Sequence, residues 1–251
     1  MDENNGIELV DLHCHLDLHE DMAGAYRRCD VLNCATLAVT TTPKAFERNR
    51  QFAERTRYAK AALGLHPQLV AERAAELKLF ESLLPSTRYV GEIGLDAGKA
   101  HYSSFSKQIF VFQRILDLCK LQGGKVISVH SARCPKKVLD CIEQSGAYRT
   151  CKIVLHWFSA SKSEIQRAID IGCFFSVNER LLETTNGRNV LALAPGSRML
   201  TETDAPFLEI NGRLLQGGDV ENSIALIAKS WAIPLDVARS KIARNAIRVL
   251  G

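Results

Sequence analysis

The chain lacks the features typical of membrane-spanning and secreted proteins. No apolar run approaches the roughly 18 residues that a membrane span requires. The start of the chain is polar and acidic, without the basic segment that begins a signal peptide. No low-complexity stretch, block of like charges or internal repeat marks a linker. We therefore expect a cytoplasmic protein that does not associate with membranes.

Two further signals are absent or weak. The 8 cysteines include no C-x-x-C pair, so their spacing predicts neither a zinc site nor a redox motif. Several lie in apolar runs, where a reduced thiol behaves as a small hydrophobic group. The net charge is only +4, whereas dedicated nucleic-acid-binding proteins usually carry a stronger basic patch. The charge is compatible with a polyanionic substrate but does not by itself indicate one.

The length of 251 residues fits one barrel domain, which typically needs roughly 250. Apolar runs alternate with segments of helical periodicity, and runs that are apolar throughout are typical of strands buried on both faces. The alternation predicts an α/β protein, a (β/α)8 TIM barrel forming a single domain over residues 1–251, with an open sheet of fewer strands as the alternative. The predicted strands are Ile7–Leu12, Val31–Val39, Lys60–Leu65, Tyr89–Ile93, Lys125–Val129, Lys152–Leu155, Cys173–Val177 and Met199–Thr201. The predicted helices are Lys44–Tyr58, Gln68–Leu84, Ser104–Gln122, Pro135–Ser145, Lys162–Ile171, Asn189–Leu193, Val220–Trp231 and Leu235–Leu250.

Imidazoles and carboxylates recur where the predicted strands end. In a barrel the carboxyl ends of the strands meet at one rim, where such enzymes hold their active sites. A single buried histidine is more often a satisfied core residue, but five of the 7 histidines follow this pattern, which chance placement explains poorly. The polar residues at strand ends are Asp11, His13, His15, His66, Glu92, His130, His156 and Asp204.

His13 and His15 indicate a metal site. A spacing of two along a strand puts both side chains on one face, while Cys14 points the other way. Two neutral imidazoles side by side favour a transition metal.

Glu92 and Asp204 are the candidate carboxylate ligands. Glu92 lies in a glycine-flanked segment, Gly91–Asp96, and its two oxygens could bridge two cations. The alternative for Glu92 is a salt-bridged acid near the barrel mouth. If the strand continues, Glu202 and Asp204 share a face, so that one could ligate a metal while the other orients it or the attacking water.

The remaining polar candidates have different expected roles. His66 is expected to contact the substrate rather than a metal. Three basic residues follow the fifth predicted strand: Arg133, Lys136 and Lys137. They would attract phosphate at the rim, or they are simply the solvated start of a helix. His19 and His101 are expected on the solvated surface.

With these residues in view, the chain resembles the TatD family of metal-dependent deoxyribonucleases, within the amidohydrolase-like barrels. Six motifs carry the resemblance, in the family's order and over nearly the whole chain. They are Asp11–Leu16 (DLHCHL), Gly64–Pro67 (GLHP), Gly91–Asp96 (GEIGLD), Val129–Ser131 (VHS), His156–Ser159 (HWFS) and Thr201–Pro206 (TETDAP).

The resemblance implies a nuclease that hydrolyses phosphodiester bonds of DNA with two divalent metal ions. Mg²⁺, Mn²⁺ and Zn²⁺ all fit, although imidazole-rich ligation favours transition metals over Mg²⁺. It implies that one metal is held by His13, His15, Glu92 and Asp204, and the second by Glu92, His130 and His156. Glu92 would bridge the two metals, Asp204 would also steer the attacking water, and His66 would face the scissile phosphate.

The chain departs from the family pattern in two places. Ala132 stands where the family usually has an arginine, and Arg133 follows one position later, which leaves its predicted contact with the substrate open. Glu209–Gly218 replaces a loop that often carries basic residues and an Asn-Glu-Pro motif. The second departure predicts a remodelled substrate groove beside an intact set of metal ligands.

Within the family, three segments are closest to the QatD branch, which belongs to a multi-component bacterial anti-phage system: Thr40–Pro43, Leu63–Gln68 and His156–Trp157. That branch implies other Qat proteins as partners. Two alternatives remain, namely a barrel hydrolase of an amide, lactone or ester and a metal-bearing subunit that is inactive alone. Many such hydrolases bridge their metals with a carboxylated lysine at the end of the fourth strand, where this chain has Glu92, and the next lysine along the chain is Lys99.

Overall fold

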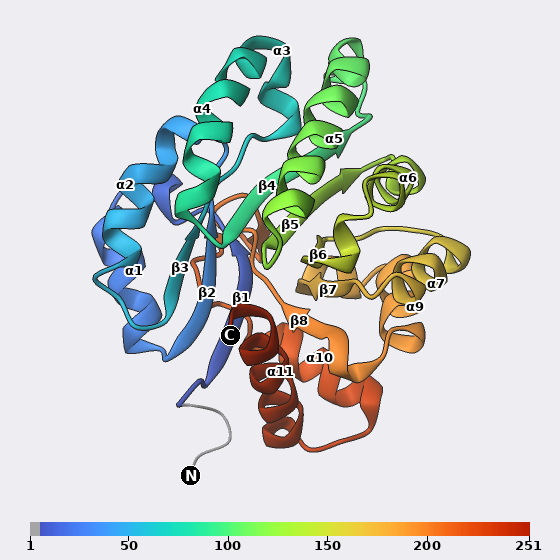
Figure 1. Cartoon of the computed structure of the whole chain (residues 1–251). Helices are drawn as coiled ribbons and strands as arrows, with labels where there is room; N and C mark the ends of the chain where they lie inside the picture. Colours follow the sequence, from blue (N-terminus) through green and yellow to red (C-terminus); the bar gives the residue numbers. More distant parts are fainter. Residues whose placement is uncertain (1–5) are drawn as a thin grey trace.

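The computed structural model describes residues 6–251, in which parallel strands surround a central axis and helices cover the outside (Figure 1). The parallel strands form two hydrogen-bonded sheets, ordered β1-β2-β3 and β4-β5-β6-β7-β8. Their bounds are β1 Leu9–Cys14, β2 Cys34–Val39, β3 Ala59–Ala62, β4 Tyr89–Asp96, β5 Val126–Ala132, β6 Lys152–His156, β7 Phe174–Val177 and β8 Met199–Thr201. The predicted (β/α)8 TIM barrel is confirmed. The single domain over residues 1–251 stays a prediction, because residues 1–5 lie outside the described part.

Two seams close the barrel. Between β3 and β4, an isolated bridge pairs Leu63 with Val90, and the Leu65 amide donates to the Glu92 carbonyl at 3.1 Å. Between β8 and β1, the Asp204 amide donates to the His13 carbonyl at 2.9 Å. Both seams bring polar residues of the predicted site together, because each runs into the carboxyl-end rim.

The helices form the outer layer, and α11 packs against both β1 and β8. Their bounds are α1 Met22–Val31, α2 Pro43–Ala53, α3 Val70–Arg73, α4 Leu77–Leu83, α5 Phe105–Gln122, α6 Pro135–Ser145, α7 Lys162–Asp170, α8 Glu179–Leu182, α9 Thr185–Leu193, α10 Glu221–Trp231 and α11 Leu235–Leu250. Short 3-10 turns span Leu16–Leu18, Pro67–Leu69, Ala74–Glu76, Leu84–Ser86, Tyr102–Ser104, Ala147–Arg149 and Gly196–Arg198. A small antiparallel hairpin, β9 Glu209–Ile210 with β10 Arg213–Leu214, follows β8.

Local signals explain where several helices begin and end. The Ser161 hydroxyl accepts from the Glu164 amide, and the Glu164 side chain accepts from the Ser161 amide, so that a capping box starts α7. Pro135 occupies the first turn of α6, where its missing N–H costs nothing. Gly146 ends α6 in the left-handed region, with φ 70°.

The structure corrects several predicted boundaries. Val31 is not in a strand but ends α1, a helix that the sequence did not predict, and its side chain is 79% exposed. The predicted helix Gln68–Leu84 is broken into α3 and α4 by a 3-10 turn. Both β4 and β5 continue three residues past their predicted ends, so His130, like Glu92, lies inside a strand. Conversely, β3 ends at Ala62, before its predicted end at Leu65, so His66 lies beyond the strand, whereas β8 has its predicted bounds, Met199–Thr201.

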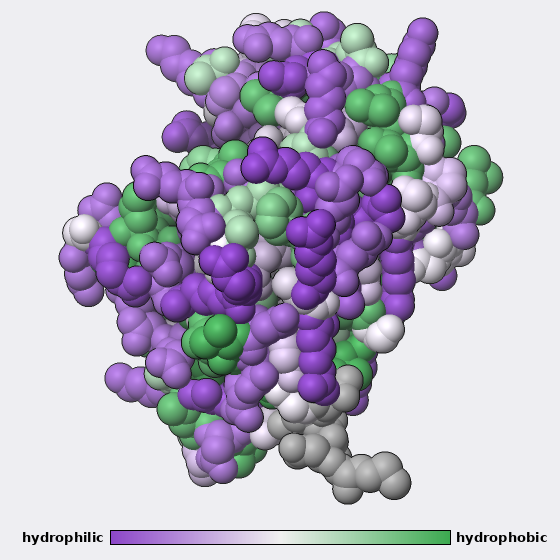
Figure 2. All heavy atoms as spheres, turned by 90° about the vertical axis from the view of Figure 1, so that its left-hand side faces the viewer, coloured by the Kyte–Doolittle hydropathy of each residue, from purple (hydrophilic) through white to green (hydrophobic). Residues whose placement is uncertain are grey.

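The outside of the barrel is mainly polar on the side that carries α1 and α2. Figure 2 shows this face as largely hydrophilic, with small separated hydrophobic patches. The 8 cysteines are all buried as free thiols, as expected for small hydrophobic groups. Among the described residues, no helix combines the length and the hydropathy needed to cross a membrane.

Candidate metal centre

Glu92 lies at the centre of the site, on β4 and 2% exposed. Its Oε2 atom lies 3.3 Å from the Nε2 atoms of three imidazoles, those of His13, His15 and His66. Its Oε1 atom is bonded to His130 Nδ1 at 2.6 Å and lies 3.8 Å from His156 Nε2. Both carboxylate oxygens therefore face nitrogen ligands, as a bridging carboxylate must.

The surrounding rings set the charge of Glu92. Burial would raise the pKa of this carboxyl, but the imidazoles of His66, His13 and His130 outweigh burial and hold the pKa well below its usual value. Burial lowers the pKa values of both His13 and His66. Neutral imidazoles next to an ionised carboxylate are the forms that ligate metals.

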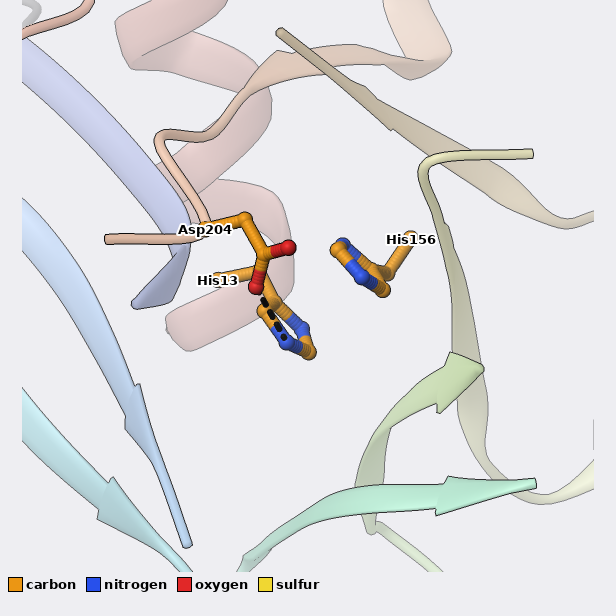
Figure 3. A group of neighbouring side chains, drawn as sticks. All are labelled: His13, His156 and Asp204. Carbon is orange, nitrogen blue, oxygen red and sulfur yellow. Dashed lines mark ion pairs between the residues drawn. The ribbon is translucent and has the colours of Figure 1, made fainter. Parts of the chain in front are cut away.

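His13 reaches the site from β1, and Asp204 reaches it from the segment that follows β8. Asp204 Oδ1 lies 3.7 Å from the Nε2 atoms of both His13 and His15. Figure 3 shows the Asp204 carboxylate pointing toward His13, with the ring of His156 facing the pair from another strand. The His13 and His156 rings stack with their centroids 3.5 Å apart. Burial, supported by the nearby Glu92 and opposed by His156, raises the pKa of Asp204 to about 6.

Glu202 orients His156 rather than sharing a strand face with Asp204. Its Oε2 atom accepts from His156 Nδ1 at 2.9 Å and from the Ser176 hydroxyl at 2.5 Å. Its Oε1 atom accepts from the Asn178 side chain at 3.0 Å and from the Trp157 amide at 3.1 Å. With Nδ1 fixed in this way, His156 Nε2 is directed toward the cluster. Burial opposes protonation of His156, but Glu202 and Asp204 raise its pKa to about 10.

Two further groups orient ligand rings. The Ser128 hydroxyl lies 2.8 Å from His13 Nδ1, on the side of the ring away from Glu92. Asp96 Oδ2 lies 3.4 Å from His130 Nε2 and also accepts from the Gln68 side chain at 2.7 Å. Although burial disfavours the charged ring, Glu92 and Asp96 raise the pKa of His130 to about 9. A metal that binds His130 therefore displaces a proton.

The residues present fit metal ions. Within the cluster, three buried ring nitrogens have no hydrogen-bond partner among the described residues: His13 Nε2, His15 Nδ1 and His130 Nε2. Orphaned buried polar atoms are costly, and a metal ion would satisfy an atom such as His13 Nε2, which faces Glu92 Oε2 at 3.3 Å. Three sets of residues could each hold a metal ion, because within each set the possible ligand atoms lie within 4.8 Å of one another. The sets are His13 with His156 and Asp204, His13 with His15 and Glu92, and His66 with Glu92 and His130. The donor set is rich in nitrogen, which suits transition metals.

Other predicted residues lie outside this cluster. Arg133 follows β5 with φ 59° and an exposed side chain. His19 and His101 are half-buried rather than fully solvated, which corrects the sequence prediction. His19 Nε2 is enclosed without a partner among the described residues, and burial lowers its pKa.

A cavity of about 400 Å³ opens onto the cluster, lined by His15, His66, Glu92, His130, His156 and Asp204, with Phe207 at its edge. A larger hollow of about 710 Å³ is also lined by Phe207. This hollow could not be predicted from the sequence, because its lining comes from three separate segments.

Comparison with known proteins agrees with this geometry. A family model described as "TatD related DNase" matches residues 10–251. The human deoxyribonuclease TATDN3 is 26% identical over 81% of this chain and 80% of its own. The metal-dependent hydrolase YjjV of Escherichia coli strain K12 is 29% identical over 81% of each chain. The 3'-5' ssDNA/RNA exonuclease TatD of Edwardsiella piscicida is 29% identical over 59% of this chain and 58% of its own.

The crystal structure of YjjV shows the same fold. It covers 96% of this chain and 97% of its own with a TM-score of 0.84, at 24% identity over the superposed residues.

Proposed function

Because the chain belongs to the TatD-related DNase family of metal-dependent hydrolases, we propose that it hydrolyses phosphodiester bonds of DNA with two divalent metal ions. One observation carries the proposal: both oxygens of the buried Glu92 face imidazole nitrogens, at distances between 2.6 and 3.8 Å. The human relative is a deoxyribonuclease and the Edwardsiella relative an exonuclease of single-stranded DNA and RNA, which supports a nucleic-acid substrate.

We assign the metals to the predicted ligands. His13, His15, Glu92 and Asp204 would hold one ion, and Glu92, His130 and His156 the other. His66 Nε2 also lies among possible ligand atoms, and we assign it to the scissile phosphate, which would enter through the same cavity. When bound, divalent ions neutralise the charge of the phosphate and make water a stronger nucleophile. Mg²⁺, Mn²⁺ and Zn²⁺ all remain candidates.

The side chains would then perform the proton and positioning steps. A water oxygen attacks the phosphorus, one P–O ester bond breaks, and Asp204 accepts the proton that the water loses. His66 donates to a phosphate oxygen and holds the phosphorus in line with the attacking water. Arg133, exposed on the turn after β5, would contact the phosphodiester backbone outside the cluster.

The barrel hydrolases of amides and lactones fit this chain less well. The carboxylated lysine that many of them use would have to replace Glu92, and Lys99 is exposed beyond the end of β4. A subunit that binds metal but needs a partner for activity is an outcome of the test below.

The test is metal-dependent cleavage of single-stranded DNA. We would strip the purified protein of metal, add Mg²⁺, Mn²⁺ or Zn²⁺ separately, and compare wild type with the double variant His13→Ala/His15→Ala. We expect cleavage by the wild type only, in the presence of at least one cation, with two metal equivalents bound. Bound metal without cleavage of DNA or RNA by the lone chain would contradict the proposal and favour the partner-dependent subunit.

We also propose that the nuclease acts in bacterial anti-phage defence, with other Qat proteins as partners. The support is the resemblance of Thr40–Pro43, Leu63–Gln68 and His156–Trp157 to the QatD branch. The same double variant, placed in cells that carry the complete defence system, should abolish protection in a plaque assay. Full protection by that variant would contradict the assignment.

A further inference from the structure

We propose that Phe207 is a stacking platform for one nucleobase of the DNA substrate, beside the metal centre. The inference deepens the proposed function and rests on it. It concerns the segment that follows β8, where the sequence departs from the family pattern. Phe207 would then select single-stranded over double-stranded DNA.

Phe207 is an exposed aromatic ring at the edge of the metal cluster. Its side chain is 61% exposed, although Ala205 and Leu208 on either side of it in the chain are buried. The ring meets the edge of His15, with centroids 5.1 Å apart and planes at 79°. One part of the ring thus packs against a proposed metal ligand, while the rest is open to a ligand. A large apolar group left in water beside a site is typical of a binding surface.

The space beside Phe207 has the size of a binding pocket. Phe207 lines both the hollow of about 710 Å³ and the metal cavity, so the two spaces adjoin at this ring. Leu18 and Leu214, which are 44% and 55% exposed, line the same hollow. Small-molecule sites commonly span about 300–1,000 Å³ and combine apolar walls with a few polar groups. A nucleoside attached to a phosphate at the cluster has room here.

The polar lining fits a heterocyclic base better than a second phosphate. Glu20 and Asp21 line the hollow and would repel a phosphate. The Arg28 guanidinium is already engaged, with Asp219 at 2.8 Å and the Gly217 carbonyl at 3.0 Å. A base carries both donors and acceptors on its edge, so it can bond to carboxylates that reject phosphate.

The platform is held in place before any ligand binds. The Gly218 amide donates to Asp11 at 2.9 Å, and the Leu215 amide donates to the Leu208 carbonyl at 2.8 Å. The Phe207 amide itself donates to the Asp204 carbonyl at 2.9 Å. Because the segment is anchored on both sides, stacking on Phe207 needs little ordering of the protein.

The consequence is a preference for unpaired bases. A base can lie on Phe207 only after leaving the stack of a duplex, which costs free energy in double-stranded DNA and little in a single strand. We expect single-stranded DNA, or a frayed end, to be cut faster than the interior of a duplex.

The experiment pairs protein variants with substrate variants. Phe207→Ala should raise the KM for a short single-stranded oligonucleotide about 5- to 150-fold, the range of base–aromatic stacking. Phe207→Trp should keep the KM near the wild-type value, because it retains an aromatic face. Phe110→Ala is the matched control, since Phe110 on α5 is 67% exposed and does not line either cavity.

An abasic site, moved one position at a time along the oligonucleotide, then locates the stacked base. At one position it should raise the KM of the wild type but leave that of Phe207→Ala nearly unchanged. Equal effects on both proteins at every position would overturn the platform while leaving the nuclease assignment intact. If the wild type cuts no nucleic acid, the proposed function fails first, and the inference fails with it.

Discussion

The two ends of the barrel strands bury different kinds of side chain, and β5 shows the contrast within seven residues. Its amino end contributes Val126 and Ile127, both fully buried among aliphatic neighbours. Its middle contributes Ser128, which contacts His13, and its carboxyl-terminal half contributes His130, which contacts Glu92. One end of the strand therefore supplies apolar burial, which stabilises the fold, and the other end supplies the groups of the site.

The carboxyl end holds its polar groups at an energetic cost. Buried polar atoms are unfavourable unless they are bonded, and a cluster of orphaned ring nitrogens is unfavourable until a metal binds. Glu202 reduces this cost locally, because all of its neighbouring donors point at its two oxygens. The comparison predicts that changes at the two ends affect activity and stability separately.

The largest effect on activity is expected from Asp204→Asn. The change keeps the size of the side chain but removes the carboxylate that accepts the proton, so turnover should fall by about 10²–10⁴-fold. Metal content, measured by plasma mass spectrometry, should stay close to that of the wild type, because an amide oxygen still reaches the ligand position. Asp236→Asn, at an exposed acid on α11, is the control. Full activity of Asp204→Asn would sink the assigned role.

The next largest effect is expected on stability, from a change at the apolar amino end of β5. Ile127→Ala should lower the free energy of unfolding by about 2–5 kcal/mol, because it leaves a cavity in a closely packed core. Urea denaturation measures this loss, and a nuclease assay below the transition should show nearly normal turnover for each folded molecule. Loss of turnover at unchanged stability would break the separation between the two ends.

The smallest expected effect belongs to Glu202→Gln. In glutamine an NH₂ group replaces one carboxylate oxygen, and this donor would face side-chain and backbone donors that now bond to Glu202. His156 should therefore lose its fixed orientation. We expect the affinity for one of the two metal equivalents to fall about 10- to 100-fold. Titration calorimetry of the metal-stripped protein measures both equivalents. Glu183→Gln, at an exposed glutamate, is the control. Equal weakening of both metals would indicate a general structural defect and not a positioning role.

Much of the barrel could be predicted because its signals are local. Strands buried on both faces are continuous apolar runs, and each predicted run overlaps one of the strands β1 to β8. The errors arose where a local pattern was ambiguous. Val31 is apolar but ends a helix with an exposed side chain, and the extension of β4 past Ile93 passes through Gly94, which is not a strand-forming residue.

The candidate ligands could also be predicted, because parallel strand ends converge at one rim. The roles of the surrounding residues could not. Glu202 was expected to share a strand face with Asp204, but β8 ends at Thr201 and Asp204 adopts φ 54°, so the two carboxylates serve different histidines. Phe207 carried no signal, since an apolar residue in a loop is ordinary until its surroundings are known.

The sequence by itself determined the strand–helix order, the identities of the polar residues at the rim and the family to which the chain belongs. Tertiary structure alone decided which groups orient the ligands and where the substrate pocket lies. The bond between His13 and Ser128 joins residues 115 positions apart, and that between Gly218 and Asp11 joins residues 207 apart. Such pairs exist only after the barrel has closed, because periodicity records the neighbours along an element and not those across it.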